Sequence, residues 1–162
     1  MISIIVAISE ENAIGKQGGL LCHLPNDLKH FKAVTNGSTV IMGERTFFSL
    51  PKHPLPNRRN VVITDVAGKT FKGAESAYSI EEAVEIVKSE SEAFIIGGGT
   101  IYRQFMPIAD KLYITHIHHS WSDADTFFPE IKATEWQLVS EEKHCADENN
   151  PFDYTFAEYK RI

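Results

Sequence analysis

The sequence predicts an α/β fold: a three-layer α/β/α sandwich around a mostly parallel central sheet, with an antiparallel C-terminal strand hairpin. Three observations predict it. Short apolar runs rich in β-branched residues recur along the chain, segments of helical periodicity separate them, and no helix separates the last two runs. The central runs are apolar on both faces, as expected where helices cover both sides of a parallel sheet.

The predicted strands share a high content of Ile, Val, Thr and aromatic residues. In chain order they cover Ile2–Ile8, Thr39–Met42, Asn60–Thr64, Ala93–Ile96, Lys111–His118, Trp136–Glu142 and Tyr154–Lys160. The last two form the antiparallel hairpin.

Helical segments fill the intervals between these strands. Pro25 suits the first turn of one helix, because its missing N–H is not needed there. Ser79 with Glu82 three residues later forms a capping box before an apolar helical face. A short helix follows over Thr100–Met106 and is stopped by Pro107.

Composition indicates one soluble globular domain over residues 1–162, with 43% hydrophobic and 23% charged residues. The formal net charge of −6 argues against nucleic-acid or anionic-membrane binding. Cys22 and Cys145 are too few for a disulfide framework, and the apolar start Met1–Ile8 lacks a basic leader and is too short to span a bilayer. We therefore expect a cytoplasmic protein.

The run Ile96-Gly97-Gly98-Gly99 joins a buried strand to a helix. Glycines there let the backbone approach a ligand, and the first N–H groups of a helix can bind a pyrophosphate. A tight strand-to-helix turn explains the run equally well, and its spacing is not that of the common dinucleotide fingerprint.

Asp27 shares one face of its predicted helix with Leu28 and Phe31. A carboxylate between large apolar side chains is costly to bury without a partner, so it is a candidate for binding paired N–H donors of a ligand. A first-turn acidic residue that favours the helix dipole is the alternative.

A third candidate is Gly43-Glu44-Arg45-Thr46, where another strand ends and a helix begins, with Arg58 and Arg59 in a turn downstream. The planar guanidinium suits a carboxylate or a phosphate. Two adjacent arginines are also typical of a solvated turn.

These candidates belong to one longer pattern. It comprises Ala7, Ile14-Gly15, Leu24-Pro25 with Asp27 and Phe31, Val40-Ile41-Met42-Gly43 with Thr46, Leu55-Pro56 with Arg58, Ile96-Gly97-Gly98-Gly99 with Tyr102 and Gln104, Thr115-His116-Ile117, and Asp125-Thr126 with Phe128-Pro129. In order and spacing the pattern resembles the bacterial chromosomal dihydrofolate reductases over nearly the whole chain.

The resemblance implies hydride transfer from NADPH to 7,8-dihydrofolate, giving the tetrahydrofolate that one-carbon metabolism needs. It assigns Asp27, Leu20 and Thr115 to catalysis. Asp27 is expected to be the only ionisable side chain at the pterin and to accept hydrogen bonds from it, with Thr115 completing the network. Water entering beside Leu20 is the expected proton donor, and residues 15–24 are the expected mobile loop.

The same resemblance implies two sets of binding residues. Those expected at the substrate are Ile5, Ala7, Asp27, Leu28, Phe31, Leu50, Leu55, Arg58, Ile96, Tyr102 and Thr115, with Arg58 on the carboxylate of the glutamate tail. Those expected at the cofactor are Ala7, Ile14, Gly15, Leu20, Gly43, Arg45, Thr46, Ser49, Thr64, Asp65, Gly97, Gly98, Gly99, Thr100, Ile101, Tyr102, Gln104 and Thr126.

The chain departs from the family pattern at three positions. Glu44 and Asp65 are acidic near the expected 2′-phosphate of NADPH, which Arg45 would then hold alone, so we expect NADPH to be preferred with NADH partly tolerated. Cys22 stands where the family often has Trp. We interpret it as a small apolar substitute, not a reactive thiol.

Several alternatives remain at this stage. The reductase of riboflavin biosynthesis resembles the same fold, but Asp27 on the Phe31 helix, together with Arg58, favours a pterin substrate. The intact Asp27, Ala7 and glycine turn argue against a catalytically idle folate-binding module. His116 and His118 share a strand face, but no further ligand completes a metal set, so no metal is expected. Antifolates such as methotrexate and trimethoprim are expected ligands, although trimethoprim sensitivity is left open by Leu20 and Cys22. A monomer is the simplest expectation.

Overall fold

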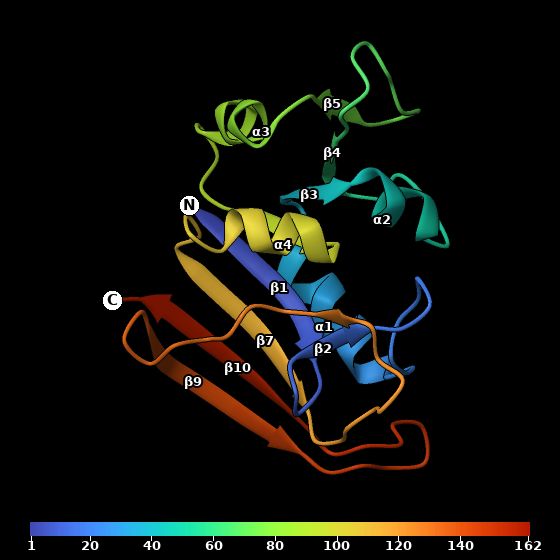
Figure 1. The fold of residues 1–162 in the computed structure, drawn as a ribbon, viewed down its shortest axis with the longest axis vertical. Helices are drawn as coiled ribbons and strands as arrows, with labels where there is room; N and C mark the ends of the chain where they lie inside the picture. Colours follow the sequence, from blue (N-terminus) through green and yellow to red (C-terminus); the bar gives the residue numbers. More distant parts are fainter.

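The structure is a computed structural model that describes all 162 residues. Its centre is an eight-stranded sheet with the strand order β5-β4-β3-β6-β1-β7-β10-β9 (Figure 1). The strands of this sheet are β1 (Ile2–Ile8), β3 (Thr39–Gly43), β4 (Arg59–Ile63), β5 (Glu75–Ala77), β6 (Ala93–Gly97), β7 (Lys111–Ile117), β9 (Trp136–His144) and β10 (Tyr154–Arg161). A separate two-stranded ribbon pairs β2 (Ala13–Gly15) with β8 (Thr126–Phe127).

The direction of the strands confirms the predicted mostly parallel sheet with an antiparallel end. Strands β5, β4, β3, β6, β1 and β7 pair in parallel, and β10 then pairs antiparallel with both β7 and β9. Parallel strands need long crossover connections, and helices supply most of them here. The hairpin β9–β10 forms one edge of the sheet, at the lower left of Figure 1.

Four helices complete the three layers: α1 (Pro25–Thr35), α2 (Glu44–Ser49), α3 (Ile80–Val87) and α4 (Gly99–Phe105). One apolar cluster joins the sheet to Ala83 and Val87 of α3 and to Phe105 of α4. A second cluster, on residues of the opposite strand face, contains Phe47 of α2 and contacts Phe31 of α1. Two separate cores on one sheet are what a sandwich of three layers requires.

Local signals located the helices well. Pro25 is in the first turn of α1, and the Ser79 hydroxyl accepts a 3.0 Å hydrogen bond from the backbone N–H of Glu82 at the start of α3. The strands β2, β5 and β8 were not predicted. Each has two or three residues, too few to show an alternating pattern, and forms only through pairing with another segment.

The parallel strands end at one edge of the sheet, and the segments that follow them gather there. In α/β sheets this is the edge where ligands bind.

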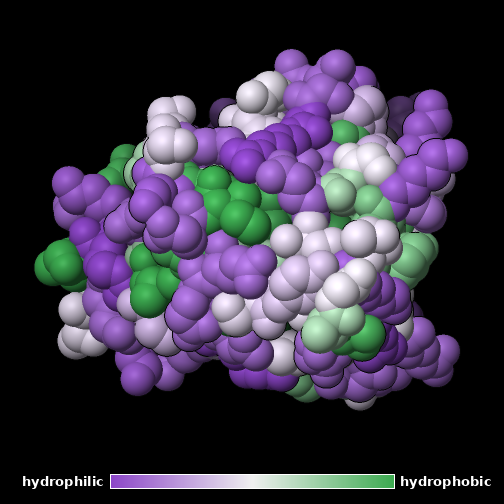
Figure 2. Space-filling view, turned by 90° about the horizontal axis from the view of Figure 1, so that it is seen from above, coloured by the Kyte–Doolittle hydropathy of each residue, from purple (hydrophilic) through white to green (hydrophobic).

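Hydrophilic side chains predominate on the face shown in Figure 2, and apolar groups appear there in separate patches. None of the helices combines the length and apolar composition needed to cross a membrane.

Candidate active site

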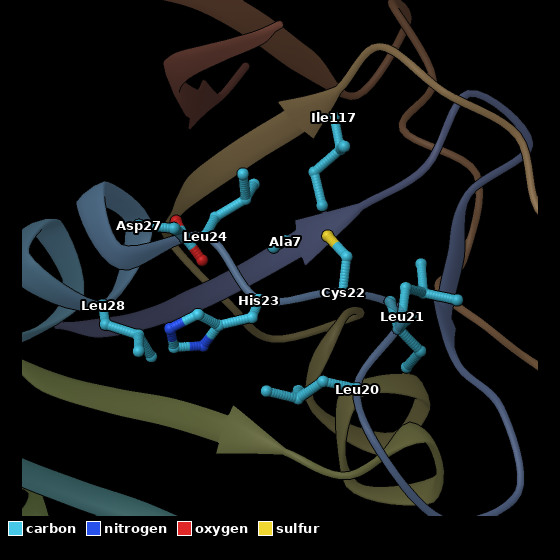
Figure 3. A pocket seen from close by; sticks show the side chains of 10 residues that line it. Ala7, Leu20, Leu21, Cys22, His23, Leu24, Asp27, Leu28 and Ile117 are labelled. Atoms are coloured by element: carbon cyan, nitrogen blue, oxygen red, sulfur yellow. The ribbon is translucent and has the colours of Figure 1, made fainter. Parts of the chain in front are cut away.

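A mainly apolar pocket, open to solvent, lies between α1, the ends of β1 and β7, and the loop before α1 (Figure 3). Its lining residues are Ala7, Ile14, Leu20, Leu21, Cys22, His23, Leu24, Asp27, Leu28 and Ile117. Asp27 is the one carboxylate among them. Such a pocket fits a flat organic ring that carries a few hydrogen-bond donors.

Asp27 is held in place by the buried Thr115. The Thr115 hydroxyl on β7 donates a 2.6 Å hydrogen bond to Oδ1 of Asp27 on α1. Burial raises the pKa of Asp27 above its ordinary value, while the bond from Thr115 and the nearby His30 act in the opposite direction. The other carboxylate oxygen has no hydrogen bond from the protein, so it can accept one from a ligand.

The predicted apolar walls of the substrate site come together. Ile5 is buried in the second core cluster, and Phe31, Leu50, Leu55 and Ile96 pack against the same cluster. Leu28 is 48% exposed and faces the pocket mouth (Figure 3). The predicted walls other than Ala7 and Leu28 therefore belong to one apolar cluster, and Arg58 lies beside its member Phe31.

Arg58 and Arg59 differ sharply in their surroundings. Arg58 lies 5.9 Å from the ring centre of Phe31 and donates to the Pro56 carbonyl (2.8 Å) and the Thr35 hydroxyl (3.2 Å). It has no carboxylate partner, and burial lowers its pKa below the usual arginine range. Arg59 instead forms ion pairs with Glu75 and Glu90. Arg58 is therefore the arginine that can bind an external carboxylate.

The glycine run forms the second half of the site. Gly97 has a φ of 129°, which favours glycine, and a Cβ added there would lie 3.5 Å from the Thr46 hydroxyl. A Cβ on Gly99 would lie only 2.7 Å from Cγ2 of Thr126, and one on Gly43 would lie 3.1 Å from Cγ1 of Ile101. Glycine is therefore required at Gly43 and Gly99 for the side chains of Ile101 and Thr126 to pack this closely against the backbone.

These contacts show which predicted cofactor residues the fold assembles. Around the ends of β3 and β6 it gathers Gly43, Thr46, Gly97, Gly98, Gly99, Ile101 and Thr126, with Ile14 beside Gly99. Neither Gly43 nor Gly98, the N-cap residues of α2 and α4, provides a side-chain cap. The local backbone therefore fits a dinucleotide whose pyrophosphate needs N–H donors.

The remaining predicted cofactor residues lie farther from this centre or are already engaged. Tyr102 is buried, and its hydroxyl donates to the Ile5 carbonyl at 3.0 Å, so it supports the glycine run from behind. Thr64 is buried and donates to Glu44. The exposed members of the set are Arg45, Ser49, Asp65, Thr100 and Gln104. Their contacts with a cofactor stay a prediction.

The segment from residue 15 to residue 24, here called the lid, forms one side of the pocket through residues 20–24. Its Leu20 is 73% exposed at the pocket edge, as expected of a side chain that a ligand would cover. The backbone N–H of Gln17 donates to Oδ2 of Asp125 at 2.8 Å, and Lys16 forms a 3.3 Å ion pair with Asp123. The predicted mobile loop is thus tied to the segment before β8.

The pocket contains residues that the sequence interpretation did not assign to the site. Leu21, Leu24 and Ile117 line it, and Ile117 could have been found from its position two residues after Thr115 on the same strand face. His23 and Cys22 line it too. The pocket lining thus includes two ionisable side chains besides Asp27, and the expectation that Asp27 alone faces the pterin stays a prediction.

Cys22 behaves as an apolar side chain in this setting. It packs against the cluster of Leu24, Ile117 and Tyr154, and burial, helped by the charge of Asp27, raises the pKa of its thiol to about 11. The protonated thiol is therefore the dominant form at neutral pH, in agreement with the interpretation of Cys22 as a small apolar substitute.

The two strand histidines have hydroxyl partners. Nε2 of His116 lies 2.8 Å from the Tyr159 hydroxyl, and Nε2 of His118 lies 2.8 Å from the Thr155 hydroxyl. Both histidines therefore take part in hydrogen bonds to residues of the neighbouring strand β10.

A parallel sheet with a glycine turn at its ligand-binding edge, beside an apolar pocket with one half-buried carboxylate, is the arrangement of a small nucleotide-dependent oxidoreductase. The family model described as "Dihydrofolate reductase" matches residues 1–161, and the chain belongs to the dihydrofolate reductase family.

Individual relatives agree with this assignment. The dihydrofolate reductase of Bacillus subtilis (strain 168) is 43% identical over 161 residues, covering 99% of this chain and 95% of the relative. Dihydrofolate reductase type 3 of Salmonella typhimurium is 42% identical over 161 residues, covering 99% and 98%. Among solved structures, dihydrofolate reductase from Enterococcus faecalis complexed with NADP(H) and RAB-propyl has a TM-score of 0.91 at 36% identity, covering 99% of this chain and 96% of that one.

Proposed function

We propose that the protein reduces 7,8-dihydrofolate to 5,6,7,8-tetrahydrofolate with NADPH as the donor. The observation that carries the proposal is the half-buried Asp27 carboxylate, which Thr115 holds in an apolar pocket whose Ile14 lies beside the Gly97–Gly99 turn. Membership of the dihydrofolate reductase family supports the same activity. The nicotinamide, when bound, supplies the hydride.

The protein's own residues would bind and orient the substrate. Asp27 would accept hydrogen bonds from the pterin N3–H and 2-amino group, so that the ring has one fixed orientation. Phe31, Leu50 and Leu55 would pack against the middle of the molecule, and Arg58 would pair with the carboxylate of the glutamate tail. Diaminopyrimidine antifolates present a similar pattern of N–H donors and would bind Asp27 in the same way.

The cofactor would lie along the turn that Gly97, Gly98 and Gly99 form with Thr46. Ala7, Ile14 and Leu20 line the pocket between that turn and Asp27, and they would exclude water from the reacting rings. Asp27 would also polarise the bound ring, and a water that enters beside Leu20 would deliver the proton.

The deciding experiment mixes the purified protein with NADPH and dihydrofolate and follows the loss of the absorbance of reduced nicotinamide. Consumption that requires both compounds, with tetrahydrofolate identified by mass spectrometry, is the expected result. A protein that binds dihydrofolate without consuming NADPH would be an idle binding module. Consumption with a ribosylated aminopyrimidine ketone but not with dihydrofolate would indicate the reductase of riboflavin biosynthesis.

Residues 1–162 would act as a single domain and as a monomer in the cytoplasm. The exposed large apolar side chains support this, because they are distributed over separate elements; they include Leu20, Phe48, Ile108 and Leu138. Light scattering of the purified protein, with the mass of one chain as the expected value, tests the oligomeric state.

A further inference from the structure

A cluster of opposite charges lies where β3 and β4 end side by side. Glu44 follows β3 directly, and its carboxylate accepts one hydrogen bond from the Thr64 hydroxyl (3.0 Å) after β4 and another from the Lys69 ammonium. The side chains of Glu44 and Lys69 are 26% and 38% exposed, so both remain within reach of a ligand. Glu44 therefore does not present a free negative charge at this edge.

The loop that carries Lys69 is fixed by its own hydrogen bonds. The Lys69 carbonyl accepts bonds from the hydroxyls of Ser76 (2.8 Å) and Tyr78 (3.1 Å), and its N–H donates to the Val66 carbonyl (3.1 Å). Its ammonium lies 5.8 Å from the ring centre of Phe71. The cation is thus positioned before any ligand arrives, which lowers the entropy lost on binding.

The type of charge at this place decides which dinucleotide a sheet of this kind accepts. An acidic residue after a strand commonly binds the free ribose 2′-hydroxyl of NADH, whereas a basic residue accommodates the 2′-phosphate of NADPH. Glu44 and Asp65 by themselves would favour NADH. The bonds from Lys69 and Thr64, however, hold the pKa of Glu44 below its usual range and compensate its charge.

Arg45 points to a different part of the site. A Cβ added to Gly18 in the lid would lie 3.8 Å from Nη2 of Arg45, so the guanidinium extends toward the lid. The contacts of Arg45 thus place it beside residues 15–24, whereas Lys69 is the cation bound at the junction of Glu44 and Thr64.

We propose that Lys69, positioned by Glu44 and Thr64, is the specificity-determining residue that selects the 2′-phosphorylated dinucleotide. The inference rests on the proposed use of a nicotinamide dinucleotide at this edge of the sheet. The 2′-phosphate replaces Glu44 as the main partner of the Lys69 ammonium, whereas a free 2′-hydroxyl leaves the Glu44–Lys69 pair intact.

The test measures dissociation constants of NADPH and NADH by nucleotide fluorescence, without turnover, for the wild type and for Lys69→Gln. We expect the dissociation constant of NADPH to rise by about ten- to hundredfold, the range that one hydrogen bond to a charged group controls, and that of NADH to change less than about twofold. Lys72→Gln is the matched control, because Lys72 is an exposed lysine of the same loop with no ion pair; it should leave both constants unchanged.

Lys69→Gln also exposes the charge of Glu44, and a second comparison separates that effect from loss of the cation. Both constants are measured for Glu44→Gln and for the double variant Glu44→Gln with Lys69→Gln. If Lys69 recognises the phosphate, the double variant binds NADPH at least about fivefold more weakly than Glu44→Gln alone, which corresponds to most of one such hydrogen bond. Equal affinities would mean that Lys69 only masks Glu44, and the proposal would be overturned.

Failure of the inference and failure of the proposed function give different results. If Lys69→Gln keeps the wild-type ratio of NADPH to NADH affinity while dihydrofolate reduction proceeds, only the inference on Lys69 is wrong. If the wild-type protein binds neither nucleotide, the proposed function itself is wrong. Unchanged NADH binding and an unchanged thermal midpoint in Lys69→Gln show that the variant is folded.

Discussion

Thr115 and Asp27 are joined by a 2.6 Å hydrogen bond between residues 88 positions apart in the chain. The bond links α1 to β7 and leaves one carboxylate oxygen of Asp27 for a ligand. It also partly compensates for burial, which raises the pKa of Asp27. A charged group that is only partly satisfied by the protein is a feature expected of a binding and catalytic residue, because the ligand supplies the missing partner.

Replacing Asp27 by Asn tests its part in turnover. The amide has the same shape but cannot carry the negative charge that polarises the ring, so we expect kcat with dihydrofolate at neutral pH to fall by about a hundredfold or more, the usual contribution of such a group. NADPH affinity and the circular dichroism spectrum should not change. Turnover equal to that of the wild type would remove Asp27 from the mechanism.

The same substitution should stabilise the fold at neutral pH. Because the pKa of Asp27 is raised in the folded state, the unfolded chain releases this proton more readily, and ionisation above the unfolded value of 3.8 destabilises the native protein. Asn does not ionise. The free energy of unfolding should therefore be higher for Asp27→Asn at neutral pH, and the difference should shrink as the pH falls toward 3.8.

Urea titrations at several pH values between neutrality and the acid limit measure this difference. Thr115→Val is the informative second variant, because it removes a bond that lowers the pKa of Asp27. Its instability relative to the wild type should grow as the pH rises. A pH-independent difference in either variant would contradict the coupling between Asp27 ionisation and stability.

The sequence predicts those features that depend on neighbouring residues. The capping residue Ser79 and the first-turn Pro25 are local signals, and they located α3 and α1. The short ribbon was missed because Ala13 pairs with Phe127, more than a hundred positions away, and neither segment has a pattern of its own. Periodicity reports which face of an element is apolar, but not which distant element will pair with it.

The same contrast between local signals and contacts of distant residues holds for the candidate site. The family pattern identified Asp27, Thr115 and Arg58. The fold joins the first two by a hydrogen bond and places Arg58 beside Phe31, which is on the same helix as Asp27. It did not identify Lys69, because the contact with Glu44 joins residues 25 positions apart through the loop between β4 and β5. In the sequence Glu44 has no basic partner at helical spacing, and only the tertiary structure brings Lys69 to it.

Alkylation distinguishes the two cysteines. Burial raises the pKa of Cys22 to about 11, so very little reactive thiolate exists at neutral pH, whereas Cys145 is exposed in the connection between β9 and β10. Iodoacetamide at neutral pH should therefore label Cys145 well before Cys22, as peptide mass spectrometry would show. Complete labelling of Cys22 within seconds would contradict its interpretation as an apolar side chain. Cys145→Ser is the control, because Cys22 is then the one thiol that iodoacetamide can label.

Closure of the lid should depend on Asp125 more than on Asp123, although both carboxylates contact residues of the lid. Asp125 accepts hydrogen bonds from the Gln17 backbone (2.8 Å) and the Thr126 hydroxyl (2.9 Å), and its own N–H donates to the Gly15 carbonyl at 3.1 Å. Asp123 contacts only the side chain of Lys16, in an ion pair whose members are 58% and 33% exposed. Exposed ion pairs contribute little, because water and salt screen them and two flexible side chains must be ordered.

Asp125→Ala should therefore lower the single-turnover rate of hydride transfer by about tenfold, since loss of a charge-assisted bond to the backbone leaves the lid open for longer. Asp123→Ala removes the same charge from the same segment and should change the rate less than about twofold, with no difference left at high salt. Stopped-flow measurements on both variants provide the comparison. Equal losses in the two variants would indicate that net charge near the lid controls the rate. Rates equal to that of the wild type in both variants would show that neither contact limits closure of the lid.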